Sequence, residues 1–241
     1  MAGTAVVATG CGWEPIDVPA LAASMRALAD DGWAGVIVTP SAPVARAVTL
    51  ALGQSRAGRR AVSVLTHLLV DPLDPALAHP PETRSPEPLA VLEAESIAGL
   101  VRSGFTVVVA GYVPVVPDGP VLYQPVDANL DAAACARRLA RDLGAGVLVL
   151  VTGADGPVRA GDVDHHAAEG WLDSDPPCAA ELLTAVRFVR AGGQVVIFTP
   201  AAFDAAALSE DRPAGDLGIL RVHRTLARPR ATTPALAAGW C

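Results

Sequence analysis

The 241-residue chain contains no lysine, because all 18 of its basic residues are arginines. Lysine carries a compact point charge, whereas arginine presents a planar fork of N–H groups. Enzymes that move phosphoryl groups often place such an ammonium group on the phosphate, so this chain would have to manage that chemistry differently. A coding bias toward Ala, Arg and Pro accounts for missing surface lysines. It does not explain the loss of a lysine that catalyses a reaction.

Aromatic residues are also scarce, at 4%, although 51% of the residues are hydrophobic. The core is therefore expected to consist mainly of Ala and Val. The net charge is −7 and no basic run occurs, which argues against nucleic acid as a partner. No apolar run approaches the roughly 20 residues that span a membrane. The first residues lack the basic region of a signal peptide. We therefore expect a cytoplasmic protein with no membrane partner.

Cysteine pairs with the spacing of a metal site are absent. The four cysteines are scattered along the chain, at Cys11, Cys135, Cys178 and Cys241. In the cytoplasm such residues are expected to be free thiols, and we predict no metal site. His165 and His166 lie near Asp162 and Asp164, which leaves metal binding open. Adjacent histidines generally point apart, so a solvated loop is favoured there.

Short apolar runs alternate with helical patterns along the chain, which is typical of a parallel sheet with crossover helices. The patterns predict buried strands at 5–9, 35–39, 61–69, 105–110, 146–152 and 195–199. They predict helices at 18–30, 43–54, 89–102, 129–143, 178–191 and 201–208. Residues 71–88, 114–125 and 158–175 are predicted as loops, the second with a hairpin turn at Asp118-Gly119, and 217–223 as an edge strand. We therefore predict an α/β three-layer sandwich with a mostly parallel central sheet, as one domain over 1–223, followed by a Pro/Ala-rich tail over 224–241.

A series of segments identifies a family. Residues 66–77 read Thr-His-Leu-Leu-Val-Asp-Pro-Leu-Asp-Pro-Ala-Leu, and 85–88 read Ser-Pro-Glu-Pro. Further matching segments follow at 91–97, 104–110, 114–116, 143–145, 149–152, 155–156 and 185–199. In order and spacing they resemble the carbamate kinases of the amino acid kinase family over nearly the whole chain. The resemblance implies the amino-acid-kinase fold. It also implies dimerisation, because kinases of this family commonly pair around the Val-Asp-Pro segment.

The loops that hold phosphate in this family are altered. The Gly-Gly-Asn that follows the family's first strand corresponds to Gly10-Cys11-Gly12. The His-Gly-Asn-Gly-Pro after its second strand corresponds to 39–43, where only the final Pro43 is kept. Pro40 removes a backbone N–H from a place where phosphate needs donors. The glycine-rich loop before Pro-Val-Val is reduced to Gly111-Tyr112-Val113.

The lysines implied by the resemblance are also replaced. The family's Asp-Lys-Asp site falls at Asp131-Ala132-Ala133, and the lysine of its last loop aligns with Glu181. The Leu-Thr-Asp that opens the nucleotide site is Val151-Thr152-Gly153. The family's protruding subdomain, the lid over the carbamate end, is reduced to 78–84. We therefore do not expect ordinary carbamate kinase activity, although whether the chain is an enzyme stays open.

Some residues remain candidates for a site at the old phosphate end. Cys11 follows the first strand, near a helix N-terminus, where a thiolate can form; it can equally be a small residue that replaces glycine. Arg46 is the best remaining cation near the pocket, or else a surface arginine. Tyr112 can plug the former substrate cleft. The predicted ligand-binding set is Thr9, Gly10, Cys11, Gly12, Thr39, Ser41, Arg46, Gly111, Tyr112, Thr152, Asp155 and Thr199, of which Cys11 is the one weak catalytic candidate.

Three functions follow as hypotheses. The first is a carbamate-kinase-like protein that has lost ATP-dependent transfer and acts as a non-catalytic subunit or regulator. The second is a repurposed enzyme that acts on a small anionic or carbamoyl-type metabolite without ATP. The third is a small-molecule sensor that uses the old cleft. No cofactor is expected, although residual binding of ATP and Mg²⁺ stays open. The expected partners are a second copy of the chain or another enzyme, with a small anionic ligand as a further candidate.

Overall fold

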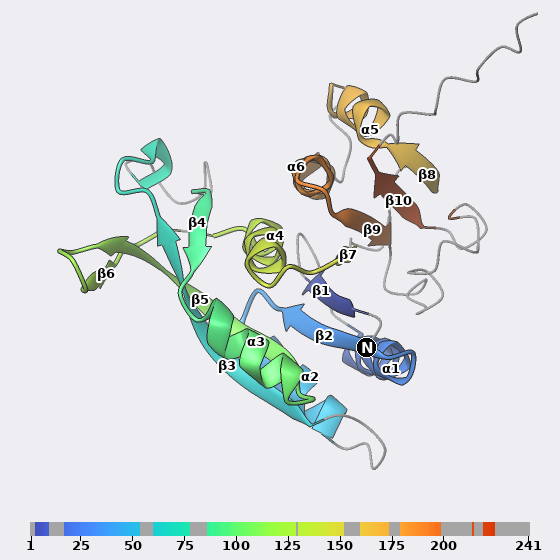
Figure 1. Cartoon of the computed structure of the whole chain (residues 1–241), viewed down its shortest axis with the longest axis horizontal. Coiled ribbons are helices and arrows are strands. Elements are labelled where there is room, and N and C mark those ends of the chain that lie inside the picture. The colour runs from blue at the N-terminus through green and yellow to red at the C-terminus, as the bar shows by residue number, and fades with distance from the viewer. Residues whose placement is uncertain are drawn as a thin grey trace, which may run out of the picture.

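The computed structural model describes residues 3–9, 17–53, 60–77, 86–128, 130–151, 160–173, 179–198, 214 and 219–224. Its strands form one ten-stranded sheet in the order β4-β3-β5-β2-β1-β7-β9-β10-β8, with β6 added beside β5 (Figure 1). The strands are β1 (Gly3–Thr9), β2 (Trp33–Val38), β3 (Ala61–Val70), β4 (Pro88–Val91), β5 (Thr106–Pro117), β6 (Tyr123–Pro125), β7 (Val147–Val151), β8 (Gly161–Asp164), β9 (Gln194–Phe198) and β10 (Leu220–His223). The central six, from β3 to β9, run parallel, while β4, β6 and β10 pair antiparallel with β3, β5 and β9. The last strand, β8, runs parallel to β10.

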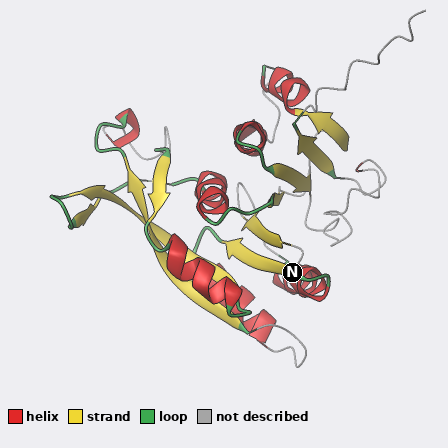
Figure 2. Cartoon of the chain, viewed as in Figure 1, coloured by secondary structure: helices red, strands yellow, loops and turns green. Residues whose placement is uncertain are grey.

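Helices cover both faces of this sheet (Figure 2). They are α1 (Val18–Asp30), α2 (Ala42–Gly53), α3 (Ala94–Arg102), α4 (Ala132–Asp142), α5 (His165–Leu172) and α6 (Ala179–Arg190), and a 3₁₀ turn η1 spans Pro75–Leu77. Val7 and Ile37 face α1 and α2 in one buried cluster. Val6 and Val36 face α3, α4 and α6 in the other. The predicted three-layer α/β architecture with a mostly parallel sheet is therefore confirmed.

The central strands read as continuous apolar runs because both of their faces are buried. In α1, Leu21, Met25 and Leu28 form the buried stripe, and the carboxylate of Asp17 accepts a hydrogen bond from Ala20 N at 2.9 Å to cap the helix. Gly35 in β2 lies where a Cβ would collide with the end of the Met25 side chain. The sequence therefore determines both the position of this helix and its close approach to the sheet.

Two predicted boundaries on the α3 side of the sheet are wrong. The helix predicted over 89–102 begins only at Ala94, because the Pro88–Val91 segment pairs antiparallel with β3 as β4. The loop predicted at 111–113 is strand. β5 continues to Pro117, and a register shift at Val64/Leu65 absorbs the extra residue in its pairing with β3.

The far end of the sheet also differs from the prediction. Residues 158–175 were expected to be irregular, yet Gly161–Asp164 form β8 and His165–Leu172 form α5. Leu220–His223 were expected to be an edge strand, but they lie between β9 and β8. The short helix predicted at 201–208 lies outside the described residues. The division into a domain over 1–223 and a tail stays a prediction.

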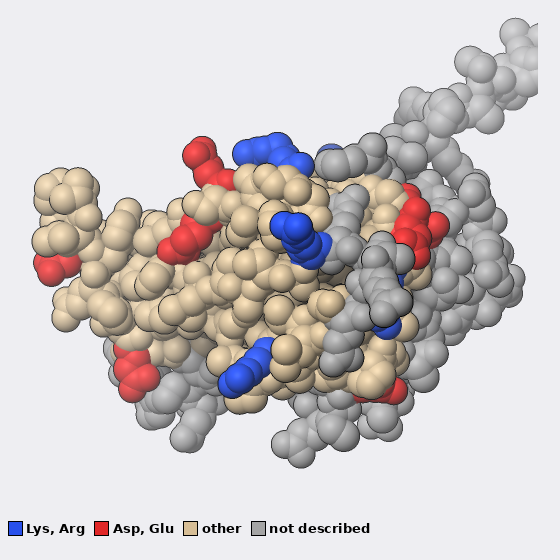
Figure 3. Space-filling view, turned by 90° about the horizontal axis from the view of Figure 1, so that it is seen from below, with Lys and Arg blue, Asp and Glu red and all other residues tan. Residues whose placement is uncertain are grey.

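Charged residues are unevenly spread over the surface. Figure 3 shows one face on which the end at the left carries carboxylates and no arginine, while the arginines lie toward the middle. The β5–β6 hairpin projects at this same end in Figure 1. None of the described helices is long and apolar enough to cross a membrane.

Candidate functional site

The carboxyl ends of the parallel strands meet at one edge of the sheet, where α/β proteins bind ligands. The strand pairing aligns Thr9 of β1 with Val151 of β7, and Val151 with Phe198 of β9. Val38 of β2 aligns with Val109 of β5. The carboxyl ends of β1, β2, β7 and β9 therefore lie together at this edge.

Threonines at this edge direct their hydroxyl groups into the sheet. Thr9 Oγ1 donates to the carbonyl oxygen of Val38 at 3.3 Å, and Thr39 Oγ1 donates to that of Val109 at 2.9 Å. Both threonines are fully buried. A hydroxyl group has one hydrogen to donate. That of Thr9 joins neighbouring strands, and that of Thr39 lies between the carbonyl oxygens of Val109 and Ser41, the latter at 3.3 Å. Both hydroxyl groups therefore have acceptors within the protein.

The other described candidates are more scattered. Ser41 precedes α2, and its carbonyl oxygen accepts from Ala45 N at 3.0 Å. Arg46 is an exposed residue of α2. Gly111 and Tyr112 lie within β5, not in a shortened loop as predicted. The Tyr112 hydroxyl donates to the carbonyl oxygen of Leu130 at 3.2 Å, and its ring packs on the core beneath α4.

Six of the predicted ligand-binding residues are outside the described part of the chain. They are Gly10, Cys11, Gly12, Thr152, Asp155 and Thr199. Their roles, including that of Cys11, stay predictions. Within the described residues, no group of three or more His, Cys, Asp or Glu side chains is arranged to hold a metal ion.

Glu181 occupies the first turn of α6 and is 6% exposed. Burial raises the pKa of this carboxyl group above its ordinary value, and the nearby Asp131 carboxylate raises it further, against a lowering by the Glu181 backbone N–H. Asp131 caps α4 through a 3.0 Å hydrogen bond from Ala133 N to its Oδ1. Two helix N-termini in the region of the predicted phosphate site thus carry acidic side chains. The resemblance implies an aspartate at position 131 as well, so only the acidic side chain of Glu181 departs from the implied phosphate site.

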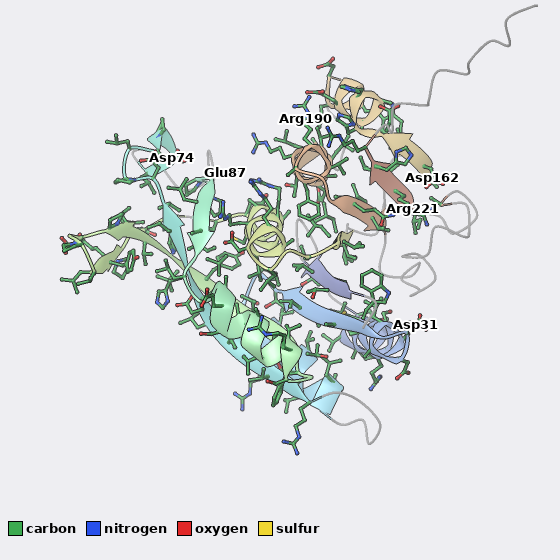
Figure 4. The ribbon with its side chains drawn as sticks, in the orientation of Figure 1. Asp31, Asp74, Glu87, Asp162, Arg190 and Arg221 are labelled. Carbon is green, nitrogen blue, oxygen red and sulfur yellow. The ribbon has the colours of Figure 1, made fainter. Side chains whose placement is uncertain are left out.

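The sequence reasoning missed an ion-pair network beside this region. Arg137 of α4 is buried and pairs with Glu87, which directly precedes β4. Glu87 also accepts from Arg187 of α6 at 3.1 Å. One carboxylate therefore joins the β4 segment to two helices, and Figure 4 shows Glu87 beside α4. Arg137 is therefore buried in this network and does not lie on a solvated face of α4.

A second ion pair of this kind lies at the opposite end of the sheet. Arg221 of β10 is buried and donates to Asp162 of β8 at 2.8 Å (Figure 4). His165 is buried at the start of α5, and its ring lies 4.0 Å from that of His166, so the two histidines do not sit in a solvated loop as predicted. Burial lowers the pKa of His165, as do the neighbouring His166 and Arg190.

Comparisons with known proteins point to one group. No protein-family model matches the chain. The carbamate kinase-like protein YahI of Escherichia coli (strain K12) is 27% identical over 205 residues, which cover 63% of this chain and 64% of YahI. The carbamate kinase of Pyrococcus horikoshii is 22% identical over 244 residues, which cover 81% of this chain and 75% of that protein. The chain thus spans less than two thirds of the length of YahI.

The same likeness appears in three dimensions. The structure of carbamate kinase from Giardia lamblia bound to AMP-PNP superposes with a TM-score of 0.74 and 17% identity. The superposition covers 92% of this chain and 98% of that protein. The fold is therefore that of a carbamate kinase, while the identity is too low to transfer site residues.

Proposed function

We propose that this chain, which resembles carbamate kinases in sequence and fold, is a carbamate-kinase-like protein that has lost ATP-dependent phosphoryl transfer. It acts instead as a non-catalytic subunit or regulator of another enzyme. The fold persists while the groups that handle phosphate have been replaced. A protein of this kind contributes a binding surface, not a reaction.

One observation carries the proposal: Glu181, a buried acidic residue, stands where the family resemblance implies a lysine. A cation there would stabilise charge that develops on the transferred phosphate, whereas a carboxylate opposes it. Burial raises the pKa of Glu181, and a carboxyl group supplies no positive charge in either protonation state. The chain has 18 arginines, and arginine is always charged. Even so, the implied lysine at position 181 is replaced by glutamate and not by arginine.

The threonine hydroxyl groups support the same conclusion. Thr9 ends β1 and Thr39 directly follows β2, the two strands that precede the expected phosphate loops. Both hydroxyl groups donate to carbonyl oxygens of neighbouring strands. Removing one preorganised donor to a transition state commonly costs about 100- to 1000-fold in rate. Several such elements have changed together, so efficient transfer is not expected even where the individual losses are not additive.

A ligand-binding measurement tests this proposal. Thermal unfolding of the full chain is followed with and without ATP–Mg²⁺, with the carbamate kinase of Giardia lamblia as the positive control. A ligand that binds the native state at 100 times its Kd stabilises it by about 2.7 kcal/mol, which is a readily measured shift. We expect no shift for this chain. A shift that matches the control would contradict the proposed loss of nucleotide handling.

We propose that the retained Val70-Asp71-Pro72 segment forms the interface through which the chain assembles. Asp71 Oδ1 accepts from Leu73 N at 2.9 Å, and Asp74 Oδ1 accepts from Ala76 N at 2.9 Å. These side-chain hydrogen bonds fix the turn that follows β3. An ordered surface turn of this kind suits an interface, either with a second copy of the chain or with another enzyme.

A further inference from the structure

We propose that a cavity between α3 and α4 binds a small carboxylate ligand, with about six non-hydrogen atoms and a short apolar chain. The cavity has a volume of about 160 Å³ and is lined by Thr4 of β1, by Ala98, Val101 and Arg102 of α3, and by Leu143 at the end of α4. We name it the α3–α4 cavity. Ligand binding there is independent of the proposed loss of phosphoryl transfer, and either can hold without the other.

The arrangement of the two helices explains why a cavity exists here. α4 packs on β1, whereas α3 packs on β2 and β5, which lie to one side of β1. Side chains alternate between the two faces of a strand, so Thr4 lies on the same face as Val6, which is buried beneath these helices. Ala98 is the shortest side chain in the lining, and it leaves space between the helices unfilled.

Two polar side chains of the α3–α4 cavity have no partner within the described part of the chain. Neither the Arg102 guanidinium group nor the Thr4 hydroxyl group forms a hydrogen bond or an ion pair there. By contrast, Arg137 of α4 and Arg187 of α6 both pair with a carboxylate. Arg102 is exposed and Thr4 is half-buried, so donors are present both at the mouth of the cavity and further inside.

The lining favours a carboxylate with an apolar chain. A guanidinium group donates two parallel hydrogen bonds to a carboxylate, and it stays charged at neutral pH. The Thr4 hydroxyl group adds a further donor. The side chains of Ala98, Val101 and Leu143 contain only carbon and hydrogen, so they suit the apolar part of the ligand. Inorganic phosphate fits less well, because it has no apolar part and carries more charge than one arginine balances.

The volume limits the size of the ligand. Pockets that enclose drug-sized molecules usually measure about 300 to 1,000 Å³. An apolar cavity of about 150 Å³ is large enough to bind benzene. The α3–α4 cavity is of this smaller kind. Butyrate therefore fits it, whereas a nucleotide is far too large.

The α3–α4 cavity lies away from the edge where a kinase of this fold would meet phosphate. Thr4 stands near the start of β1, and Thr9 ends the same strand at that edge. A strand rises by about 3.3 Å per residue, so the two threonines are roughly 16 Å apart. A ligand of this size in the cavity does not reach the candidate phosphate site. It is therefore a second site, and not a remnant of the first.

The first experiment is a titration of the full chain with sodium butyrate, followed by nuclear magnetic resonance of the backbone amides at constant ionic strength. Butyramide, which has the same shape without the charge, and inorganic phosphate are titrated in parallel. We expect saturable shifts centred on α3 and the start of β1 with butyrate, and binding at least about 10-fold weaker with butyramide. The absence of saturable butyrate binding, or equal binding of butyramide or phosphate, would overturn the proposal.

Two variants with matched controls locate the binding. Arg102→Gln changes an exposed residue and should weaken butyrate binding at least about 10-fold, whereas Arg26→Gln on α1 should bind like the wild type. Ala98→Leu should fill the cavity and abolish binding, whereas Ala23→Leu at an exposed position of α1 should not. Unchanged binding by Arg102→Gln would overturn the proposal, and this result stands even if Ala98→Leu does not fold. Unchanged binding by a folded Ala98→Leu would also overturn it.

Discussion

Thr39 donates twice to one acceptor: its hydroxyl group reaches the carbonyl oxygen of Val109 at 2.9 Å, and its backbone N–H reaches the same oxygen at 3.2 Å. The residue thus joins β2 to β5 at the edge where a kinase of this fold would meet phosphate. Thr9 joins β1 to β2 through its hydroxyl group, which donates to the carbonyl oxygen of Val38 at 3.3 Å. At these two positions, the hydroxyl groups form hydrogen bonds within the protein.

Replacing Thr39 with Val tests this structural role. Val keeps the branched shape of Thr but removes the hydroxyl group, while the backbone N–H still reaches Val109. We expect the free energy of unfolding in urea to fall by about 1 kcal/mol, the net value of one buried hydrogen bond. Thr49→Val on α2, where the hydroxyl donates to Ala45 at 2.8 Å within a helix, is the control and is expected to change stability by less. Unchanged stability of Thr39→Val would contradict a structural role for its hydroxyl.

The Arg137–Glu87 pair is expected to contribute more to stability than the Arg187–Glu87 pair. The Arg137 side chain is 6% exposed and that of Arg187 50%. Arg137→Met should destabilise the protein by about 2 kcal/mol, which is less than for a fully buried pair because Glu87 remains 46% exposed. Arg187→Met should cost at most about 0.5 kcal/mol. Chemical denaturation of both variants measures the difference, and equal effects would show that burial does not set the strength of this network.

The pH dependence of stability reports on Glu181. Its pKa is raised in the folded protein, so the unfolded chain loses this proton first, near the ordinary value of 4.5. The folded state therefore loses stability as pH rises from below 4.5 through the raised pKa. Glu181→Gln should remove this loss and be more stable than the wild type at pH 7, with the advantage disappearing at lower pH. Denaturation across this pH range measures it.

Glu95 provides the matched control, since it stands in the first turn of α3 but is exposed. A first-turn carboxylate normally interacts favourably with the helix N-terminus. Glu95→Gln should therefore be slightly less stable than the wild type at pH 7, the opposite sign from Glu181→Gln. Effects of the same sign would mean that burial of Glu181 is not the cause.

The sequence predicted the parts of the fold that simple periodicity encodes. The α1 helix was predicted with its observed bounds, because Leu21, Met25 and Leu28 repeat at helical spacing. Pro88–Val91 was misassigned because a four-residue apolar run fits a helix as well as a strand, and only its pairing with β3 decides. α5 was missed because His165–Leu172 shows little apolar periodicity.

The site was less predictable than the fold. The family resemblance indicated the strand ends and the substitution at Glu181. It also suggested a loop at Gly111, but this residue lies within the valine-rich strand β5. The direction of the Thr9 and Thr39 hydroxyl groups depends on the register of neighbouring strands, which no local pattern contains. The role of Glu87 depends on Arg137 and Arg187, which lie 50 and 100 residues away.

Phosphoryl transfer itself is the most direct test of the account. The full chain is incubated with carbamoyl phosphate and ADP–Mg²⁺, and ATP formation is followed against the carbamate kinase of Giardia lamblia at equal concentration. The loss of several phosphate-handling groups predicts a rate at least about 1000-fold lower than that of the control. A rate within about 10-fold of the control, equivalent to only about 1.4 kcal/mol of lost stabilisation, would contradict it.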